Sequence, residues 1–483
     1  MECDAAEIEP NMAGAGPKLS DTALLTGAQF SKWTLRLVFV LLAARSMGPQ
    51  KFGVYILLFT VTEFLAVASG AGYGDYLTRE TAKDARLGWG LASQLIWLRI
   101  AISLPIAALA VGLLALLHYP HLVLFAAACM ALTLLPRSVS EAVQGALRGA
   151  REYGAYLAIE LVLGGSLLIG GVLILARHGG IGMAIEAEVA GAALAAAAAF
   201  VAWTTFKAPD SIRLDRRRLL KTSAVFNAYS LVGTLYDRFD VVLLSKLAGD
   251  YATAIYGVAY RALNVTQLVA YGVLYSLLPD LSRDVFSQTE QKRLEEALGL
   301  LLSVAFFQVL ATMVFAGPAI HLLLGERYAE SALALKILIW AAVPRYINYA
   351  FNIGLLAGRR ERVFVATSLV SLAVNLGGNL LLIPRFGWRA AASLTLATEV
   401  VLLAQNAFWI RRLLGKIPLP YRVLRTSAAF LLLLAVFFAA NRAGLLPLAV
   451  GTGCLLFFAV YLYRAGFLNQ VGNVWSAARA TAA

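Results

Sequence analysis

The stretch ARSMGPQKFGVY, residues 44–55, interrupts a strongly apolar part of the chain. It follows WTLRLVFVLLA (33–43) and precedes ILLFTVTEFLAVASGAG (56–72). Gly48 followed by Pro49 ends a helix, because glycine adopts the backbone conformation that closes a helix and proline cannot continue one. The stretch therefore predicts the turn of a hairpin between two membrane-spanning helices.

Composition and segment length extend this interpretation to the whole chain. Of its 483 residues, 60% are hydrophobic and 14% charged, whereas a soluble protein carries about 25% charged residues. Backbone amides in a bilayer must be satisfied within their own segment, so long apolar segments are helices. We predict an all-α polytopic membrane protein with about fourteen transmembrane helices, at 22–44, 53–75, 89–117, 120–147, 153–176, 181–205, 222–246, 252–279, 297–323, 331–357, 363–384, 388–410, 423–441 and 445–464.

The distribution of lysine and arginine predicts the orientation. With a cytoplasmic N-terminus, the inner loops hold far more of these residues than the outer loops, which is the positive-inside pattern. We therefore expect a multi-pass protein of the inner (plasma) membrane with both termini in the cytoplasm. The net charge of +13 reflects this bias, and the basic inner loops face anionic lipid headgroups. Nucleic acid is therefore not expected as a partner.

An internal repeat divides the chain. SKLAGDYATAIYGVAY (245–260) matches the opening stretch, with Arg45 answering to Lys246, Gly48 to Gly249, and FGVY (52–55) to YGVA (256–259). LLPRSVSEAVQGALRG (134–149) matches AVPRYINYAFNIGLLAG (342–358) in the same order. The repeat predicts two pseudo-symmetric six-helix lobes related by an axis along the membrane normal. The predicted divisions are a cytoplasmic tail (1–20), an N-lobe (21–215), a C-lobe (216–417), two extra helices (418–464) and a C-terminal tail (465–483).

Charged residues inside the predicted spans are the candidate functional residues. An arginine at the centre of a membrane helix costs about 2.5 to 3.5 kcal/mol and usually faces a bundle interior or a hydrated cavity. The basic ones are Lys32, Arg36, Arg99, Arg137, Arg238, Arg261, Lys336 and Arg345.

Two of these arginines begin matched polar stripes, one in each lobe. Arg137 follows Pro136, and Ser140, Glu141 and Gln144 follow on the same helical face; Arg345 follows Pro344, and Asn348, Tyr349 and Asn352 follow likewise. The match favours a shared cavity between the lobes. A structural alternative stays open, in which Arg137 pairs with Glu141, Arg238 with Asp237 or Asp240, and Arg36 with Glu63. For Lys32 and Lys336, snorkelling to the membrane surface is favoured, and Glu160, Glu186, Glu188 and Glu399 are either packing partners or proton carriers.

Motifs for chemistry are missing from the sequence. It contains no GxxxxGK[ST], no HExxH and no CxxC pair, and its loops are short. Neither a cofactor nor a metal is expected. The pattern is typical of a transporter rather than an enzyme.

The motif around the opening stretch also resembles a known family. AARSMGPQKFGVYILLFTVTEFLAVASGAGYGDYLTRETAK (43–83) is similar to the start of Wzx-type polysaccharide (O-antigen) flippases, members of the multidrug, oligosaccharidyl-lipid and polysaccharide exporter superfamily. Met47 departs from the usual leucine. The resemblance implies a V-shaped, two-lobed fold with a central cavity that opens alternately to each side. It also implies that an undecaprenyl-diphosphate-linked oligosaccharide repeat unit is flipped across the inner membrane, for O-antigen, capsule or exopolysaccharide synthesis.

On this hypothesis the buried residues take two roles. Arg137 and Arg345 hold the diphosphate or an anionic sugar, because arginine offers a forked set of donors to anionic oxygens. The remaining cavity residues are Arg99, Arg238, Arg261, Asn348, Asn352, Gln144 and Gln267, and the candidates for ion coupling are Glu63, Glu141, Asp237, Asp240 and Glu399. Besides the lipid-linked oligosaccharide, polysaccharide polymerase machinery is a candidate partner. The alternatives are an ion-coupled multidrug antiporter and a lipid II flippase.

Overall fold

A computed structural model describes residues 19–70, 73–206, 216–267, 287–358, 360–415 and 421–467. Every regular element in these ranges is a helix, which confirms the predicted class. The helices are α1 (Leu19–Ala68), α2 (Tyr73–Lys83), α3 (Ala85–Leu116), α4 (His121–Ala131), α5 (Leu134–Gly149), α6 (Tyr153–Ala176), α7 (Ile181–Phe206), α8 (Arg216–Thr266), α10 (Gln288–Leu324), η1 (Glu326–Tyr328), α11 (Ala329–Leu338), η2 (Ile339–Ala341), α12 (Ala342–Ala357), α13 (Glu361–Phe386), α14 (Trp388–Leu414), α15 (Tyr421–Arg442) and α16 (Pro447–Arg464).

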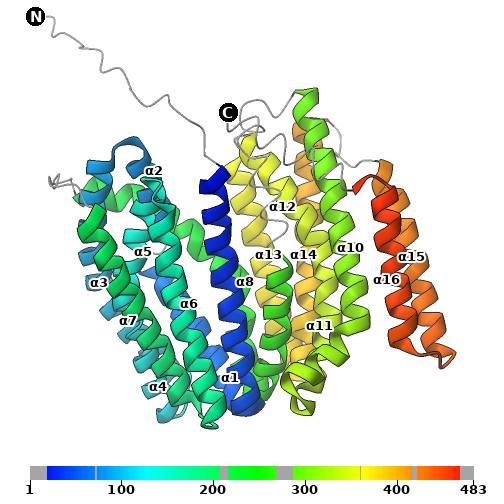
Figure 1. Ribbon diagram of the computed structural model, residues 1–483, viewed down its shortest axis with the longest axis horizontal. Coiled ribbons are helices and arrows are strands. Elements are labelled where there is room, and N and C mark those ends of the chain that lie inside the picture. The colour runs from blue at the N-terminus through cyan, green and yellow to red at the C-terminus, as the bar shows by residue number, and fades with distance from the viewer. Residues whose placement is uncertain are drawn as a thin grey trace, which may run out of the picture.

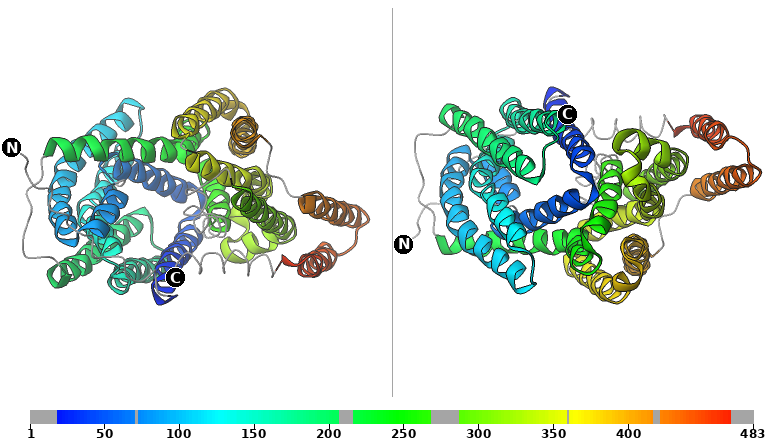
Figure 2. Two further views of the ribbon diagram at one scale, coloured as in Figure 1. Left: turned by 90° about the horizontal axis from the view of Figure 1, so that it is seen from above. Right: turned by 90° about the horizontal axis from the view of Figure 1, so that it is seen from below.

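The helices form two groups that meet at α1 and α8. Figure 1 shows α2–α7 on one side and α10–α14 on the other, with α1 and α8 packed together between them. The pair α15 and α16 lies at the outer edge of the second group, as the end-on views of Figure 2 show. Eleven helices of the described part are long and apolar enough to cross a membrane. The count of fourteen spans and the residue limits of the lobes stay predictions.

Two glycines bend the central helices in the same way. Gly48 in α1 has φ 72° and ψ 168°, and Gly249 in α8 has φ 83° and ψ 178°. This conformation is accessible to glycine and strained for other residues. Each bend lies between two predicted spans, so the hairpin turn predicted at Gly48 recurs at Gly249, as the repeat requires. The end of the bundle that carries both bends is called the glycine end below; it is the predicted outer end.

The bends also correct one part of the repeat. Helix α1 continues without interruption from Gly48 to Ala68, and α8 continues from Gly249 to Thr266. Counted from the glycines, Tyr55 and Tyr256 hold the same position, seven residues along. The sequence match of Tyr55 with Ala259 is therefore wrong by three residues. This shift is nearly one helical turn, so the mismatched residues still lie on about the same face of the helix.

Matched breaks precede the two Pro-Arg motifs. The predicted span 120–147 is divided into α4 and α5 just before Pro136, and the predicted span 331–357 is divided into α11, η2 and α12 just before Pro344. A proline inside a helix removes one backbone hydrogen bond and its ring clashes with the preceding turn, so both spans break at equivalent places. The sequence also missed α2, a short helix in a predicted inner loop. It is followed by Asp84, whose carboxylate caps α3 by accepting from the Arg86 and Leu87 amides.

Close packing joins the two groups at the glycine end. A methyl group on Gly53 of α1 would lie 1.9 Å from the carbonyl oxygen of Asp250 in α8, so only glycine fits there. The Tyr328 hydroxyl donates to the Ala44 carbonyl oxygen at 2.8 Å, and its ring meets Phe52 edge-on. One buried apolar cluster runs through residues of both groups. Phe52 and Gly53 of the opening stretch thus lie in the contact between the lobes.

Candidate functional site

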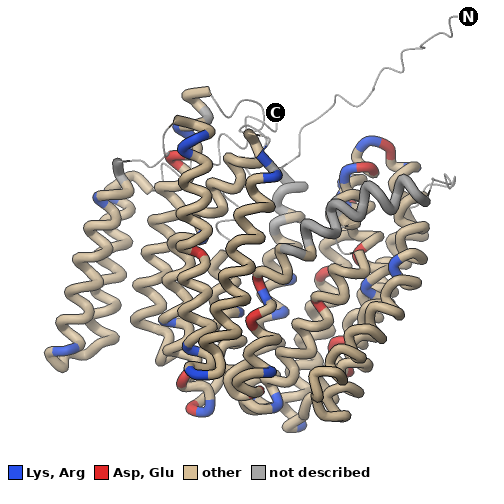
Figure 3. Tube along the Cα trace, turned by 180° about the vertical axis from the view of Figure 1, so that it is seen from behind, with Lys and Arg blue, Asp and Glu red and all other residues tan. Residues whose placement is uncertain are grey.

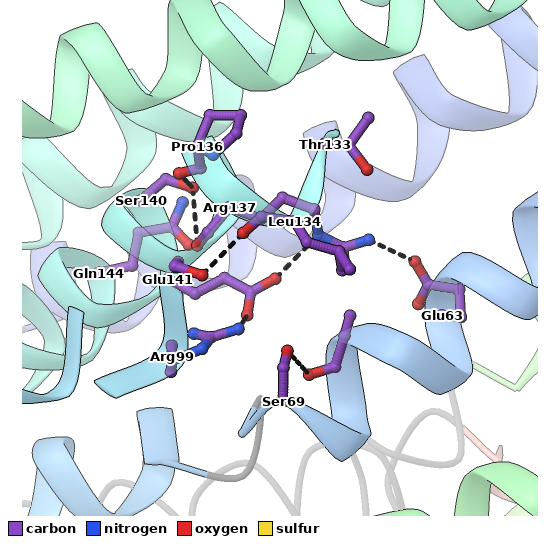
Figure 4. Close-up of polar contacts among 12 residues, drawn as sticks. Glu63, Ser69, Arg99, Thr133, Leu134, Pro136, Arg137, Ser140, Glu141 and Gln144 are labelled. Atoms are coloured by element: carbon purple, nitrogen blue, oxygen red, sulfur yellow. Dashed lines mark hydrogen bonds and ion pairs between the residues drawn. The ribbon is translucent and has the colours of Figure 1, made fainter. Parts of the chain in front are cut away.

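Charged residues lie halfway along the helices as well as at their ends (Figure 3). In the N-terminal group, Arg137 on α5 donates to Glu63 on α1 at 2.8 Å and to Glu141 one turn along at 3.0 Å. Arg99 on α3 donates to the second oxygen of Glu141 at 2.6 Å. Figure 4 shows the four side chains converging from three helices. The carboxylates hold α1, α3 and α5 together, and about a quarter of the side chains of Glu63, Arg137 and Glu141 stays exposed.

Two further ion pairs connect α1 to the last helices of its group. The Arg36 guanidinium binds both oxygens of Glu188 on α7, at 2.8 and 2.9 Å, and the Tyr55 hydroxyl donates to the same carboxylate at 2.6 Å. Lys32 pairs with Glu160 on α6 at 3.1 Å. The alternative pairing of Arg36 with Glu63 is therefore wrong, and the lone carboxylates Glu160 and Glu188 are packing partners in this structure.

Gln144 belongs to the Glu160 pair rather than to an open surface. Its amide donates to Glu160 at 3.2 Å, and the residue is buried. Lys32 keeps 44% of its side chain exposed while its ammonium reaches the buried carboxylate. The lysine thus points inward to a partner instead of snorkelling to the membrane surface.

The second Pro-Arg motif is sealed inside the C-terminal group. Arg345 on α12 donates to Glu399 on α14 at 2.7 Å, and the two side chains are only 5% and 3% exposed. Asn348 donates to the other oxygen of Glu399 at 3.0 Å. Asn406 donates to the amide oxygens of Asn348 and Asn352 at 3.2 and 3.1 Å. The matched arginines therefore differ: Arg137 stays partly exposed, whereas Arg345 is enclosed by packing.

The carboxylates of α8 have different surroundings. Asp240 is buried, accepts the hydroxyl of Tyr256 and the amide of Val241, and has no cation within ion-pair distance among the described residues. Asp237 is exposed. Neither pairs with Arg238, so that alternative is also wrong. Gln267 accepts a hydrogen bond from Tyr349 at 2.9 Å and is buried.

Three arginines converge on one aromatic ring where the groups meet. The guanidinium carbons of Arg36, Arg238 and Arg261 lie 4.4, 5.6 and 5.2 Å from the centre of the Phe59 ring. Arg36 and Phe59 belong to α1, whereas Arg238 and Arg261 belong to α8. Arg36 is neutralised by Glu188. Within the described ranges, Arg238 and Arg261 have no carboxylate partner, and both are partly exposed. These three residues are called the arginine cluster below.

Most of the predicted site residues are thus gathered in three places. Arg99, Arg137, Glu63 and Glu141 form one network, and Arg345, Glu399, Asn348 and Asn352 form another. Arg238 and Arg261 come together at the lobe contact. The sequence analysis did not identify Phe59, Tyr55, Tyr256 or Asn406 as site residues. Only the two tyrosines could have been found from the sequence, because they lie at equal distances from the matched glycines. No group of His, Cys, Asp or Glu suited to a metal occurs in the part of the chain that the structure describes.

Comparisons with known proteins agree with this architecture. The family model described as polysaccharide biosynthesis protein matches residues 19–284, more than half of the chain. A relative from Haloferax volcanii, described as a probable low-salt glycan biosynthesis flippase (Agl15), is 23% identical over 375 residues, covering 75% of this chain and 77% of the relative.

Solved structures of transporters share the fold. The lipid II flippase MurJ in an inward closed conformation superposes with a TM-score of 0.70 at 13% identity, over 93% of this chain and 99% of that one. A multidrug resistance transporter of the MATE family in an inward-facing conformation gives 0.66 at 15% identity, over 84% and 96%. The chain therefore has the fold seen in these transporter structures. The chain is thus a multi-pass membrane protein that belongs to the polysaccharide biosynthesis protein family.

Proposed function

We propose that this protein flips an undecaprenyl-diphosphate-linked oligosaccharide repeat unit across the inner (plasma) membrane by alternating access. The product would serve O-antigen, capsule or exopolysaccharide assembly on the outer side. Both termini lie in the cytoplasm on this proposal, which rests on the loop charges.

The observation that carries the proposal is the arginine cluster. A diphosphate is a compact polyanion, and guanidinium groups bind its oxygens with paired, charge-assisted hydrogen bonds. Among the described residues, Arg238 and Arg261 have no carboxylate of their own, so their charge is available to a ligand. Phe59 shields one side of the cluster from water, which strengthens electrostatic attraction there. A bound diphosphate would also contact both α1 and α8.

The contacts change the roles expected for the matched arginines. Arg345 is saturated by Glu399 in a buried pair, and we assign it a structural role in the C-terminal group. Arg137 is held between Glu63 and Glu141 with part of its side chain exposed, so it borders the path of the substrate instead of binding its diphosphate first. For ion coupling we favour Asp237 and Asp240, since Glu63, Glu141 and Glu399 are occupied by arginine.

The test is leaflet exchange in proteoliposomes. A fluorescent undecaprenyl-diphosphate oligosaccharide is incorporated, and the fraction reached by an external quencher reports flipping. We expect Arg238→Gln combined with Arg261→Gln to reduce flipping to the protein-free rate. The control is Arg442→Gln, an exposed cation at the end of α15, which should flip at the wild-type rate.

Other outcomes separate the alternatives. Wild-type flipping by the double variant would overturn the role of the cluster. Exchange of lipid II in preference to the oligosaccharide would show a lipid II flippase instead. Uptake of a cationic dye driven by an ion gradient would show a multidrug antiporter instead. Gel filtration of each variant confirms that a loss of flipping is not a loss of folding.

A further inference from the structure

An apolar groove lies on the N-terminal group of helices. It lies between the second half of α1, α4 and α7, and its volume is about 800 Å³.

The groove has the length of one bilayer leaflet. Its wall on α7 extends from Ile181 to Ala193, which corresponds to about 18 Å of helix. Half of the hydrocarbon core of a membrane is about 15 Å thick. Leu122 and Phe125 of α4 line the opposite wall and are largely exposed. The groove therefore fits an extended acyl chain of a phospholipid that belongs to the leaflet at the glycine end.

Two opposite charges lie in this apolar lining. Lys51 follows the Gly48 bend by three residues, and Glu186 lies five residues after the start of α7, so both are near the glycine end. Both side chains are exposed, and within the described ranges neither forms an ion pair. A carboxylate that faces lipid without a cation is unfavourable. A ligand that brings one negative and one positive group would satisfy both residues.

We propose that the groove binds a phospholipid with a primary ammonium headgroup, of the phosphatidylethanolamine type. Lys51 pairs with the lipid phosphate, Glu186 accepts hydrogen bonds from the lipid ammonium, and one acyl chain fills the space between α4 and α7. A purely anionic lipid would meet the Glu186 carboxylate, and a choline headgroup has no N–H to donate to it.

The experiment is native mass spectrometry of the purified full chain titrated with phosphatidylethanolamine, phosphatidylcholine or phosphatidylglycerol of the same acyl chains. We expect the wild type to bind phosphatidylethanolamine most tightly. Glu186→Gln should weaken that binding about fivefold, which corresponds to about 1 kcal/mol, and bring it to the level of phosphatidylcholine. The matched control is Arg177→Gln, an exposed cation at the same end of the bundle that does not line the groove.

A second variant tests the acyl chain independently of charge. Ala190→Phe places a ring in the groove and should weaken binding of all three lipids equally. Equal or tighter binding of phosphatidylglycerol by the wild type would overturn the headgroup assignment. Unchanged binding in both Glu186→Gln and Ala190→Phe would overturn the site itself.

Discussion

Arg45 and Lys246 hold equivalent positions in the two halves of the chain, and each reaches across to the end of a helix in the other half. Arg45 donates to the carbonyl oxygens of Leu322 and Leu323, at 3.2 and 3.4 Å, in the last turn of α10. Lys246 donates to the carbonyl oxygen of Leu117, directly after α3. The last carbonyls of a helix carry partial negative charge and attract cations. The two contacts therefore tie the lobes together at the glycine end.

Removing both cations should loosen this end. A cation at a helix C-terminus contributes about 0.3 to 1 kcal/mol, so each of Arg45→Gln and Lys246→Gln should raise the population of states open at the glycine end roughly two- to fivefold. Spin labels at Gln50→Cys and Glu326→Cys, in a chain whose native cysteines are replaced by alanine, report the separation by pulsed electron resonance.

The control for this pair is Arg385→Gln, which removes an exposed cation at the end of α13. It should leave the distance distribution unchanged. If the double variant also keeps the wild-type distribution, these contacts do not hold the lobes together.

Gly53→Ala should separate α1 from α8. The added methyl group would meet backbone atoms of Asp250, which cannot rotate away, so we expect a loss of about 1 to 3 kcal/mol. Thermal unfolding in detergent measures the effect. Gly112→Ala is the matched control, because nothing lies within 4 Å of its added methyl group and alanine favours the helix. Equal melting temperatures for Gly53→Ala and the wild type would contradict this packing.

The Arg345–Glu399 pair should be more costly to break than to replace. Either Arg345→Leu or Glu399→Leu alone leaves a buried charge without its partner, which costs about 3 to 5 kcal/mol. The double variant removes both charges and should be clearly more stable than either single variant. Thermal unfolding of all three completes the cycle. Additive losses would show that the two side chains do not interact.

The two equivalent tyrosines should differ in importance. Tyr55→Phe leaves Glu188 bound to Arg36, whereas Tyr256→Phe leaves Asp240 with the Val241 amide and no cation among the described residues. A buried acceptor that loses its donor costs about 1 to 3 kcal/mol. We expect the lower melting temperature for Tyr256→Phe. The reverse order would mean that the Arg36 pair depends on Tyr55.

The sequence by itself determined the helical class, the membrane location and the two matched bends. These features depend on local chemistry: apolar length, the lack of water in a bilayer, and the backbone freedom of glycine at Gly48 and Gly249. The breaks before Pro136 and Pro344 also have a local cause, because proline acts within one helical turn.

Only the tertiary structure decided which charges pair. The sequence placed Arg137 and Arg345 in matched stripes, yet Arg345 is sealed against Glu399 while Arg137 stays partly open. Arg36 binds Glu188, 152 residues away, rather than Glu63. Such choices depend on how whole helices rotate and pack, and helical spacing within one segment carries no information about the face that a distant segment presents. For the same reason, the convergence of α1 and α8 on Phe59 became visible only in three dimensions.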